Sequence, residues 1–86
     1  MRIVFTRRFV LAHRRLSQTT RAKADKAIGL LASNPRHPSL HLKRIRSTPD
    51  LWEVRVDRDH RMTLQIEADC YVMRNIGRHD EALGRP

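Results

Sequence analysis

The sequence predicts an α+β domain of β-α-α-β-β-β-β order, in which an antiparallel meander sheet carries a two-helix hairpin packed on one face. Three observations predict this fold. The first half of the chain has apolar residues at helical spacing, the second half has them at every second position, and short linkers separate the segments of the second half. A chain of 86 residues suffices for one domain and is too short for two, so we expect a single domain over residues 1–86.

The first half predicts one strand and two helices. We expect a short strand over residues 2–5, followed by a helix over residues 7–16 that Thr6 caps. A second helix is expected from about residue 20 to residue 33, where apolar residues follow the i, i+3, i+4, i+7 pattern before Asn34-Pro35 ends it. The two helices should form a hairpin.

The second half predicts four consecutive strands. After a turn at residues 35–38, apolar and polar residues alternate in four short segments. Because their linkers are short, consecutive strands should pair antiparallel. The expected strands cover residues 40–46, 51–57, 61–67 and 71–77.

Positive charge dominates the first half of the chain. The formal net charge is +9, and residues 1–46 carry 12 basic and 1 acidic side chain, whereas residues 47–86 carry 6 basic and 8 acidic ones. A one-sign field of this strength favours a polyanion, and the excess of arginine over lysine favours bidentate contact with phosphate. An acidic protein partner, or a merely solvated surface, remains an alternative.

Several classes of protein do not fit this composition. Cys70 is the only cysteine, which excludes an internal disulfide framework, and the histidines lack the spacing of a zinc site. No apolar run approaches the roughly 18 residues of a membrane span, and no apolar signal-peptide core follows the basic start. Phosphate-loop, dinucleotide and nucleophile-elbow motifs are missing. We therefore expect a cytoplasmic protein with no membrane contact, metal or cofactor.

Strand parity predicts where the arginines of the sheet lie. A two-residue loop at Arg58-Asp59 would mix polar and apolar side chains on both faces of the hairpin. A loop of odd length with its tip at Arg58 keeps each face consistent. It pairs Val56 with His60, Arg55 with Arg61, Val54 with Met62 and Trp52 with Leu64.

This register places two like charges opposite each other. Such a cross-strand pair is normally destabilising, and a bound anion would offset the repulsion between Arg55 and Arg61. At the next turn, a two-residue loop would pair Thr63 with Arg74 and put Arg74 diagonal to Arg61. Three arginines would then share the helix-free face. Purely structural pairing of these arginines with Glu53 or Asp57 is the alternative.

An arginine cluster beside a histidine suits RNA cleavage, in which the ribose 2′-hydroxyl attacks its own phosphate. The arginines would stabilise the charge on the phosphorane, and a proton donor would serve the leaving 5′-oxygen. His79 follows the last strand and is our candidate for that donor. The general base stays open among several residues, namely Glu53, His41, Asp57, Asp80 and Lys43.

Two runs of sequence resemble a known family. Leu51-Trp52-Glu53-Val54-Arg55-Val56-Asp57-Arg58-Asp59-His60-Arg61-Met62 and the later Ile76-Gly77-Arg78-His79-Asp80-Glu81-Ala82-Leu83 are similar to the RelE/ParE toxin superfamily, nearest its YoeB and YafQ branches. The order of elements matches over essentially the whole chain. The resemblance implies an mRNA interferase, which is a ribosome-dependent endoribonuclease paired with an antitoxin, and a RelE-like fold.

The resemblance also implies roles for individual residues. Arg61 corresponds to the phosphate-stabilising arginine, Arg55 to a binding arginine and His79 to the C-terminal catalytic histidine. His41 lies near a histidine used in the YafQ branch. Leu83 occupies a region in which several members carry an aromatic residue that can stack on a base.

The expected partners are RNA and protein. We expect contacts with ribosomal RNA and messenger RNA on the ribosome from a set of basic residues, namely Arg14, Arg15, Lys43, Arg44, Arg46, Arg74 and Arg78. An acidic, partly disordered segment of a cognate antitoxin would fit the arginine-rich surface. A homodimer or a toxin–antitoxin hetero-oligomer is open.

Three other functions compete with the nuclease. A non-catalytic toxin of the ParE type would bind a protein target such as gyrase, and a degenerate member would be a regulator that binds DNA with its antitoxin. A stand-alone RNA chaperone would bind RNA with steep salt dependence but would not cut it.

Overall fold

The structure is a computed structural model that describes residues 1–86. The element order confirms the predicted α+β class and adds a 3₁₀ turn and a C-terminal helix. The elements are β1 (Arg2–Phe5), α1 (Arg7–Arg14), α2 (Gln18–Ser33), η1 (Pro38–Leu40), β2 (Lys43–Arg44), β3 (Leu51–Arg55), β4 (His60–Ile66), β5 (Cys70–Arg78) and α3 (His79–Gly84).

The five strands form one sheet in the order β1-β5-β4-β3-β2. Strands β2 to β5 are the predicted antiparallel meander. Strand β1 lies at the edge and runs parallel to β5, from Arg2 opposite Cys70 to Phe5 opposite Met73, so the sheet is mixed. Short linkers fix the direction of β2 to β5 only, because two helices separate β1 from the strands that follow.

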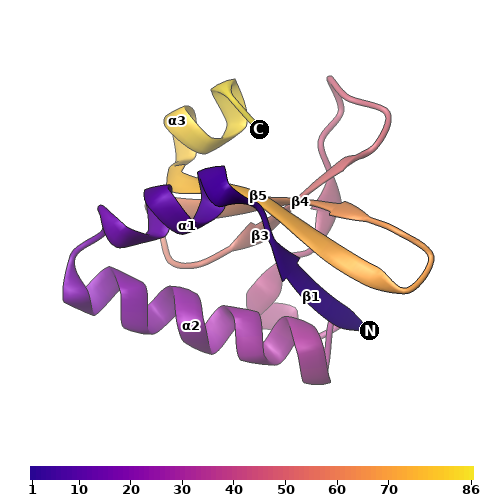
Figure 1. Cartoon of the computed structure of the whole chain (residues 1–86), viewed down its shortest axis with the longest axis horizontal. Coiled ribbons are helices and arrows are strands. Elements are labelled where there is room, and N and C mark those ends of the chain that lie inside the picture. The colour runs from indigo at the N-terminus through magenta and orange to yellow at the C-terminus, as the bar shows by residue number, and fades with distance from the viewer.

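Helices cover both faces of the sheet. Helix α2 lies on one side, whereas α3 lies on the opposite side (Figure 1). The expectation of a helix-free face was therefore wrong. Residues 79–84 form a helix for two reasons. Asp80 and Glu81 are acidic residues that suit a first helical turn, and Ala82 is the fully buried residue through which the helix packs against the rest of the protein.

The core lies between the sheet and the helices α1 and α2. The apolar positions that alternate along β3, β4 and β5 face helical residues at i, i+3 and i+4 spacing, as the sequence predicts. The fully or nearly fully buried side chains of this core include Phe9, Ala24, Leu31, Leu40, Val54, Met62, Leu64 and Met73. None of the helices is both long enough and apolar enough to cross a membrane.

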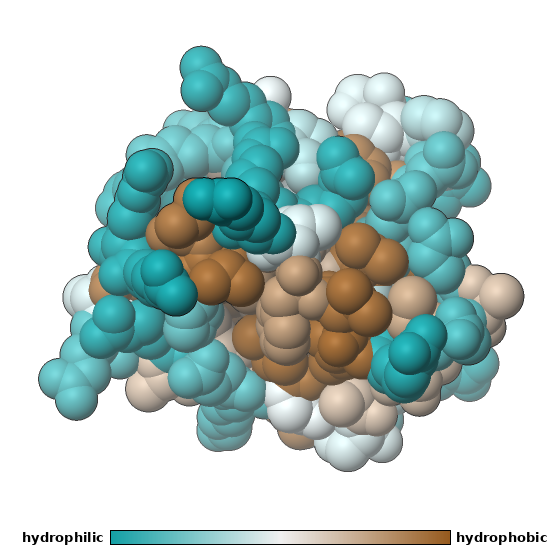
Figure 2. Space-filling view, viewed as in Figure 1, coloured by the Kyte–Doolittle hydropathy of each residue, from teal (hydrophilic) through white to brown (hydrophobic).

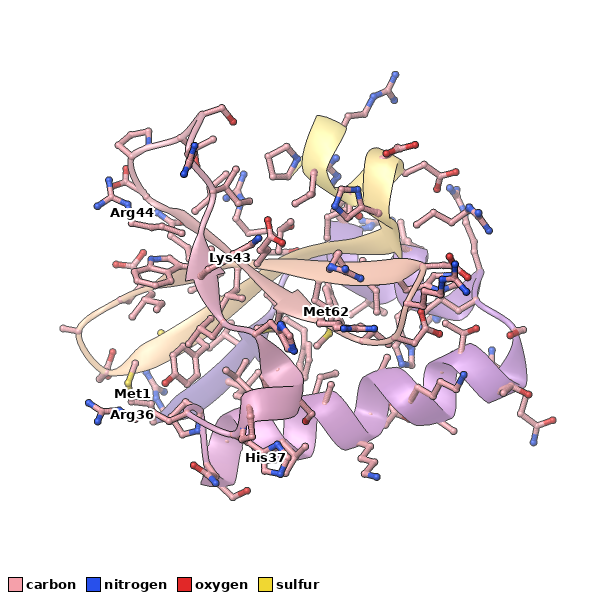
Figure 3. All side chains as sticks on the ribbon, turned by 180° about the vertical axis from the view of Figure 1, so that it is seen from behind. Met1, Arg36, His37, Lys43, Arg44 and Met62 are labelled. Carbon is pink, nitrogen blue, oxygen red and sulfur yellow. The ribbon has the colours of Figure 1, made fainter.

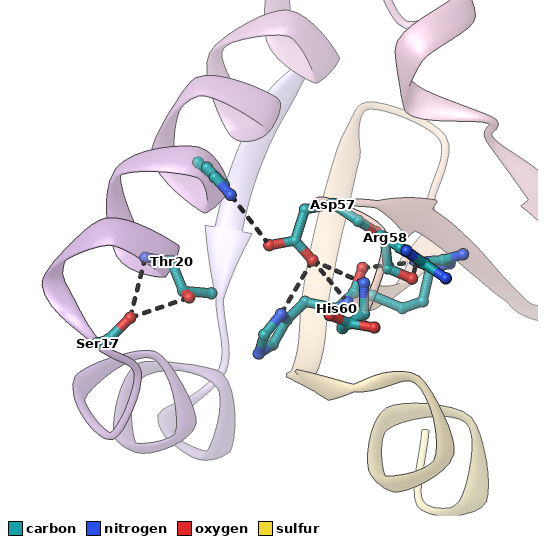
Figure 4. Close-up of polar contacts among 8 residues, drawn as sticks. Ser17, Thr20, Asp57, Arg58 and His60 are labelled. Carbon is teal, nitrogen blue, oxygen red and sulfur yellow. Dashed lines mark hydrogen bonds and ion pairs between the residues drawn. The ribbon is translucent and has the colours of Figure 1, made fainter.

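Side-chain caps set where the two N-terminal helices begin. The Thr6 hydroxyl accepts a hydrogen bond from the Phe9 N–H at 3.2 Å, as predicted, and donates one to the Met73 carbonyl at 2.8 Å. The Ser17 hydroxyl accepts from the Thr20 N–H at 3.2 Å (Figure 4), so α2 begins two residues earlier than expected. Helix α1 ends at Arg14, two residues earlier than expected.

Strand β2 is much shorter than the predicted strand over residues 40–46. Pro38 starts a 3₁₀ turn that takes in Leu40, and His41 has a φ of 46° in the left-handed region. Neither conformation continues a strand. Only Lys43 and Arg44 pair with β3, opposite Glu53 and Trp52.

The hairpin of β3 and β4 has the register that parity predicts. Arg55 pairs with Arg61, Val54 with Met62 and Trp52 with Leu64. The Val56 N–H donates to the His60 carbonyl at 3.1 Å, which closes the loop of odd length.

The register of β4 and β5 follows the prediction only in part. It holds from the Glu67 N–H, which donates to the Cys70 carbonyl at 2.9 Å, to the pair Leu64–Met73. The register then shifts at Thr63, which pairs with Asn75 and not with Arg74. The predicted pair was wrong because one extra residue in β5 makes a β-bulge, which strand parity cannot detect.

Candidate nucleic-acid interface

Arg55 and Arg61 are direct cross-strand partners at the hairpin end of β3 and β4. Both side chains are partly buried, and neither lies within 4.0 Å of a carboxylate. Two uncompensated guanidinium groups on adjacent strands repel each other. They also make a site that a phosphate group can neutralise.

The Arg61 guanidinium is anchored to the hairpin. Its Nη1 atom donates to the carbonyl oxygen of Asp57 at 2.7 Å and to that of His60 at 2.9 Å. Its Nη2 and Nε atoms make no hydrogen bond within the protein. Part of the guanidinium is therefore fixed and part remains free to donate to an anion.

Glu53 and Lys43 continue the same sheet face. Glu53 lies two residues before Arg55 and pairs with Lys43 of the neighbouring strand β2, and the Lys43 Nζ atom is 3.9 Å from the Glu53 Oε1 atom. The Glu53 residue is only 8% exposed. Of the residues considered as a general base, these two lie together on the face that carries both arginines.

His79 begins α3 beside the hairpin. Its backbone N–H donates to the Asp59 carbonyl at 2.8 Å, and the preceding residue, Arg78, pairs with His60. The imidazole is half exposed, and its Nδ1 atom lies 3.4 Å from an Asp80 carboxylate oxygen. These bonds fix the start of α3 against the loop next to Arg61.

Asp57 is turned toward α2 and holds the hairpin in place (Figure 4). One carboxylate oxygen accepts hydrogen bonds from the His60 ring at 3.0 Å and from the N–H groups of Asp59 and His60 at 2.9 Å. The other lies 3.6 Å from the Lys23 Nζ atom. Burial alone would raise the pKa of Asp57, but the hydrogen bonds outweigh it and lower that pKa. Such a carboxylate is a poor general base.

Arg15 and Arg78 line the same groove, which lies between α1 and α3. The groove has a volume of about 710 Å³, and the end of β5 forms its floor. His60, Arg8 and Arg85 also line it. The structure thus gathers two of the predicted RNA-binding residues, but at a different place from the Arg55–Arg61 pair.

The other predicted residues are dispersed. Arg44 alternates with Lys43 along β2, and Figure 3 shows the two side chains leaving that strand in different directions. Arg14 lines a smaller pocket of about 260 Å³ beside Phe9. Three more lie elsewhere: His41 and Arg46 are exposed in the segments that flank β2, and Arg74 is partly buried at the bulge, where its Nε atom has no hydrogen-bond partner.

Solved structures of similar fold come from bacteria and archaea. The YoeB/ParE toxin from Agrobacterium tumefaciens aligns with a TM-score of 0.76 at 14% identity over 92% of this chain and 99% of that one. A chain of the RelB-RelE antitoxin-toxin complex from Methanococcus jannaschii aligns with a TM-score of 0.74 at 16% identity, covering 91% and 92% of the two chains. YafQ from E. coli gives a TM-score of 0.73 at 17% identity, covering 94% and 97%.

The chain has the fold of the RelE/ParE toxin superfamily. No protein-family model and no curated protein sequence matches it, so the relationship is visible in structure and not in overall sequence. Within this RelE-like fold the resemblance first noted at residues 51–62 and 76–83 corresponds to the hairpin of β3 and β4 and to the junction of β5 with α3.

Sequence reasoning overlooked three residues of this RelE-like domain that line the groove. His60 was considered only for zinc spacing, although Asp57 three residues earlier is a typical partner in a tight turn. Arg8 lies seven residues before Arg15 on the same helix face, which the helical period reveals. Arg85 had no signal, because its position depends on α3.

Proposed function

We propose that this protein is the toxin of a type II toxin–antitoxin system and cuts messenger RNA on the ribosome in the cytoplasm. The observation that carries the proposal is the Arg55–Arg61 pair, which has no carboxylate within 4.0 Å and adjoins the loop that anchors His79. Solved neighbours of the same fold include antitoxin–toxin complexes, which supports the class of system.

The proposed reaction is transfer of a phosphoryl group within the RNA strand. The 2′-hydroxyl attacks the adjacent phosphorus, the bond to the 5′-oxygen breaks, and the products are a 2′,3′-cyclic phosphate and a 5′-hydroxyl. Arg61 and Arg55 would hold the non-bridging oxygens and stabilise the phosphorane. Two carbonyl groups already fix part of the Arg61 guanidinium, so the side chain loses little conformational entropy when RNA binds.

Two proton transfers complete the reaction. The imidazolium of His79 would give its proton to the leaving 5′-oxygen. Glu53, beside Lys43 on the arginine face, is our candidate for the group that takes the proton of the 2′-hydroxyl. Asp57 is not, because Lys23, His60 and two backbone N–H groups already occupy its carboxylate.

An acidic antitoxin is the proposed protein partner. Strand β1 is a sheet edge that exposes Val4 by 41% and Phe5 by 44%, and Figure 2 shows apolar residues here bordered by hydrophilic ones. Arg2 is the first residue of this strand, and Arg7 lies two residues after its end. A segment that combines apolar and acidic side chains would cover such a surface.

A toxin that only binds a protein target is the second candidate. Leu83 favours it, because several nuclease members carry an aromatic residue in this region. The two candidates differ in their need for His79, which a binding-only toxin does not use.

Induced expression tests the proposal. We expect growth arrest with the natural chain and relief of arrest with His79→Gln or Arg61→Ala, and primer extension on translated mRNA should show cuts only with the natural chain. Arg36→Gln, an exposed arginine in the loop after α2, is the matched control and should arrest growth. Unchanged arrest with both site variants would refute the nuclease.

A further inference from the structure

The groove between α1 and α3 is a second cleft, separate from the arginine face of the sheet. Its α3 wall consists of Asp80, Glu81 and Gly84 of the helix and the C-cap residue Arg85, at the i, i+1, i+4, i+5 positions of one helix side, whereas His79 does not line it. The His79 side chain therefore lies on the side of α3 that faces away from the groove. A ligand in the groove would not occupy the proposed cleavage site.

Unpaired positive charge lines this groove. Four arginines face it, and none lies within 4.0 Å of a carboxylate, although two acidic residues share the α3 wall. Arg8 donates to the backbone carbonyl of Arg85 and so links the two walls. Arg15 and Arg78 make no side-chain hydrogen bond, which leaves both guanidinium groups free for an anion.

His60 adds an oriented ring nitrogen at the floor. Its imidazole is 17% exposed, and its Nδ1 atom lies 3.0 Å from an Asp57 oxygen. Because an ionised carboxylate only accepts, Nδ1 must carry the hydrogen, and Nε2 is the nitrogen left for a ligand. Nε2 accepts from a hydroxyl when the ring is neutral and donates to phosphate when the ring is protonated.

The remaining lining distinguishes nucleotides from acidic peptides. Leu11, Leu16 and Ile76 give the groove apolar surface, which a flat base can cover. Asp80 and Glu81 only accept hydrogen bonds, and a ribonucleotide offers hydroxyl and amino donors for them. An acidic peptide offers carboxylates that they would repel. The volume of about 710 Å³ lies in the range of roughly 300 to 1,000 Å³ that is usual for small-ligand sites.

We propose that the α1–α3 groove binds one ribonucleotide, with its phosphate on Arg15 and Arg78, its sugar hydroxyls toward His60 and the α3 carboxylates, and its base on the apolar wall. The nucleotide is either free or one unit of an RNA strand. Binding here needs no cleavage, so the proposal stands or falls independently of the proposed function.

Nuclear magnetic resonance titration of the full chain tests this site. Adenosine 5′-monophosphate and a six-nucleotide RNA are the two probes, the latter added to the His79→Gln variant so that a nuclease would not consume it. We expect shifts of the amides of Ile76 and Gly77 and of the His60 ring protons. Shifts with the mononucleotide indicate a free nucleotide, whereas shifts with the hexanucleotide alone indicate an RNA strand, and either result supports the site.

Charge-removing variants make the test specific. Arg15→Gln and Arg78→Gln should each weaken binding on the order of tenfold, the usual effect of losing a charge-assisted hydrogen bond. Both residues are solvent-accessible, so folding should survive, and Arg36→Gln should bind like the natural chain. Unchanged affinity in both variants, shifts confined to residues 53–55 and 61–63 with none at His60, Ile76 or Gly77, or binding of a hexaglutamate peptide in place of the nucleotide would overturn the proposal.

Discussion

Arg55 of β3 and Arg61 of β4 face each other across the antiparallel ladder, with no carboxylate within 4.0 Å of either guanidinium. Repulsion in such a pair works against the folded state, whereas most cross-strand pairs support it. We therefore expect the pair to matter more for binding an anion than for stability. Stability and activity should respond in opposite directions when Arg55 is removed, whereas Arg61 also bonds the hairpin carbonyls and so supports the fold as well.

Arg55→Thr should separate these two effects. Threonine suits a strand and removes the like charge, so the free energy of unfolding should stay the same or rise by about 0.2 to 1 kcal/mol, while mRNA cleavage falls. Urea unfolding and primer extension measure the two quantities. Gln65→Thr is the matched control, because Gln65 lies in β4 on the same sheet face as Arg55 and Arg61, and it should leave cleavage intact. A clear loss of stability in Arg55→Thr would show that the pair is structural.

Arg61→Lys should lose most of the mRNA cleavage activity, although it keeps the positive charge. Lysine has no planar fork with which to bond the Asp57 and His60 carbonyls and an anion at once. We expect cleavage to drop nearly as far as in Arg61→Ala, together with faster amide hydrogen exchange in the loop at residues 57–60. Cleavage equal to that of the natural chain would mean that charge alone suffices at this position.

Asp57→Asn should make the free energy of unfolding less dependent on pH in the acidic range. Because the pKa of Asp57 is lowered on folding, its ionised form stabilises the protein above the ordinary aspartate pKa of about 3.9, and this contribution is lost as pH falls through the folded-state value. The variant should therefore be less stable by about 1 to 2 kcal/mol at pH 7. The difference should shrink below about pH 4.

Urea unfolding of both chains between pH 3 and pH 7 checks this expectation. Asp25→Asn is the control for a general loss of negative charge, because Asp25 is an exposed partner of His13 whose contribution should be small. If the free energies of unfolding of Asp57→Asn and the natural chain differ by the same amount across this pH range, the proposed link between the Asp57 pKa and stability is wrong.

Strand parity was the strongest source of structural information in this sequence. Alternation in residues 51–57 and 60–67 excluded one loop length and so predicted the Arg55–Arg61 pair correctly. Parity fails wherever one strand has an extra residue relative to its neighbour, as at the β-bulge of Arg74. The parallel position of β1 and the helix at residues 79–84 depend on tertiary packing, which local pattern does not encode.

The candidate site was predictable to a similar degree. Residues on one strand face, such as Glu53 and Arg55, follow from the register. Residues that meet only because helices pack do not, and the joining of Arg15 with Arg78 in one groove is an example. Asp57 was misjudged as a base within reach because its orientation toward Lys23 depends on where α2 lies.

Leu83→Tyr should increase cleavage if the proposed nuclease lacks only a stacking surface. Leu83 lies in α3, partly exposed, four residues after His79, so the two side chains lie on the same side of the helix. An aromatic ring here would stack on a base beside the reacting phosphate, and such stacking contributes about 1 to 3 kcal/mol per base. We expect cleavage to rise on the order of tenfold or more. Leu83→Met, which changes the side chain without adding a ring, should leave cleavage unchanged. Equal cleavage by Leu83→Tyr and Leu83→Met would show that base stacking at this position does not limit the reaction.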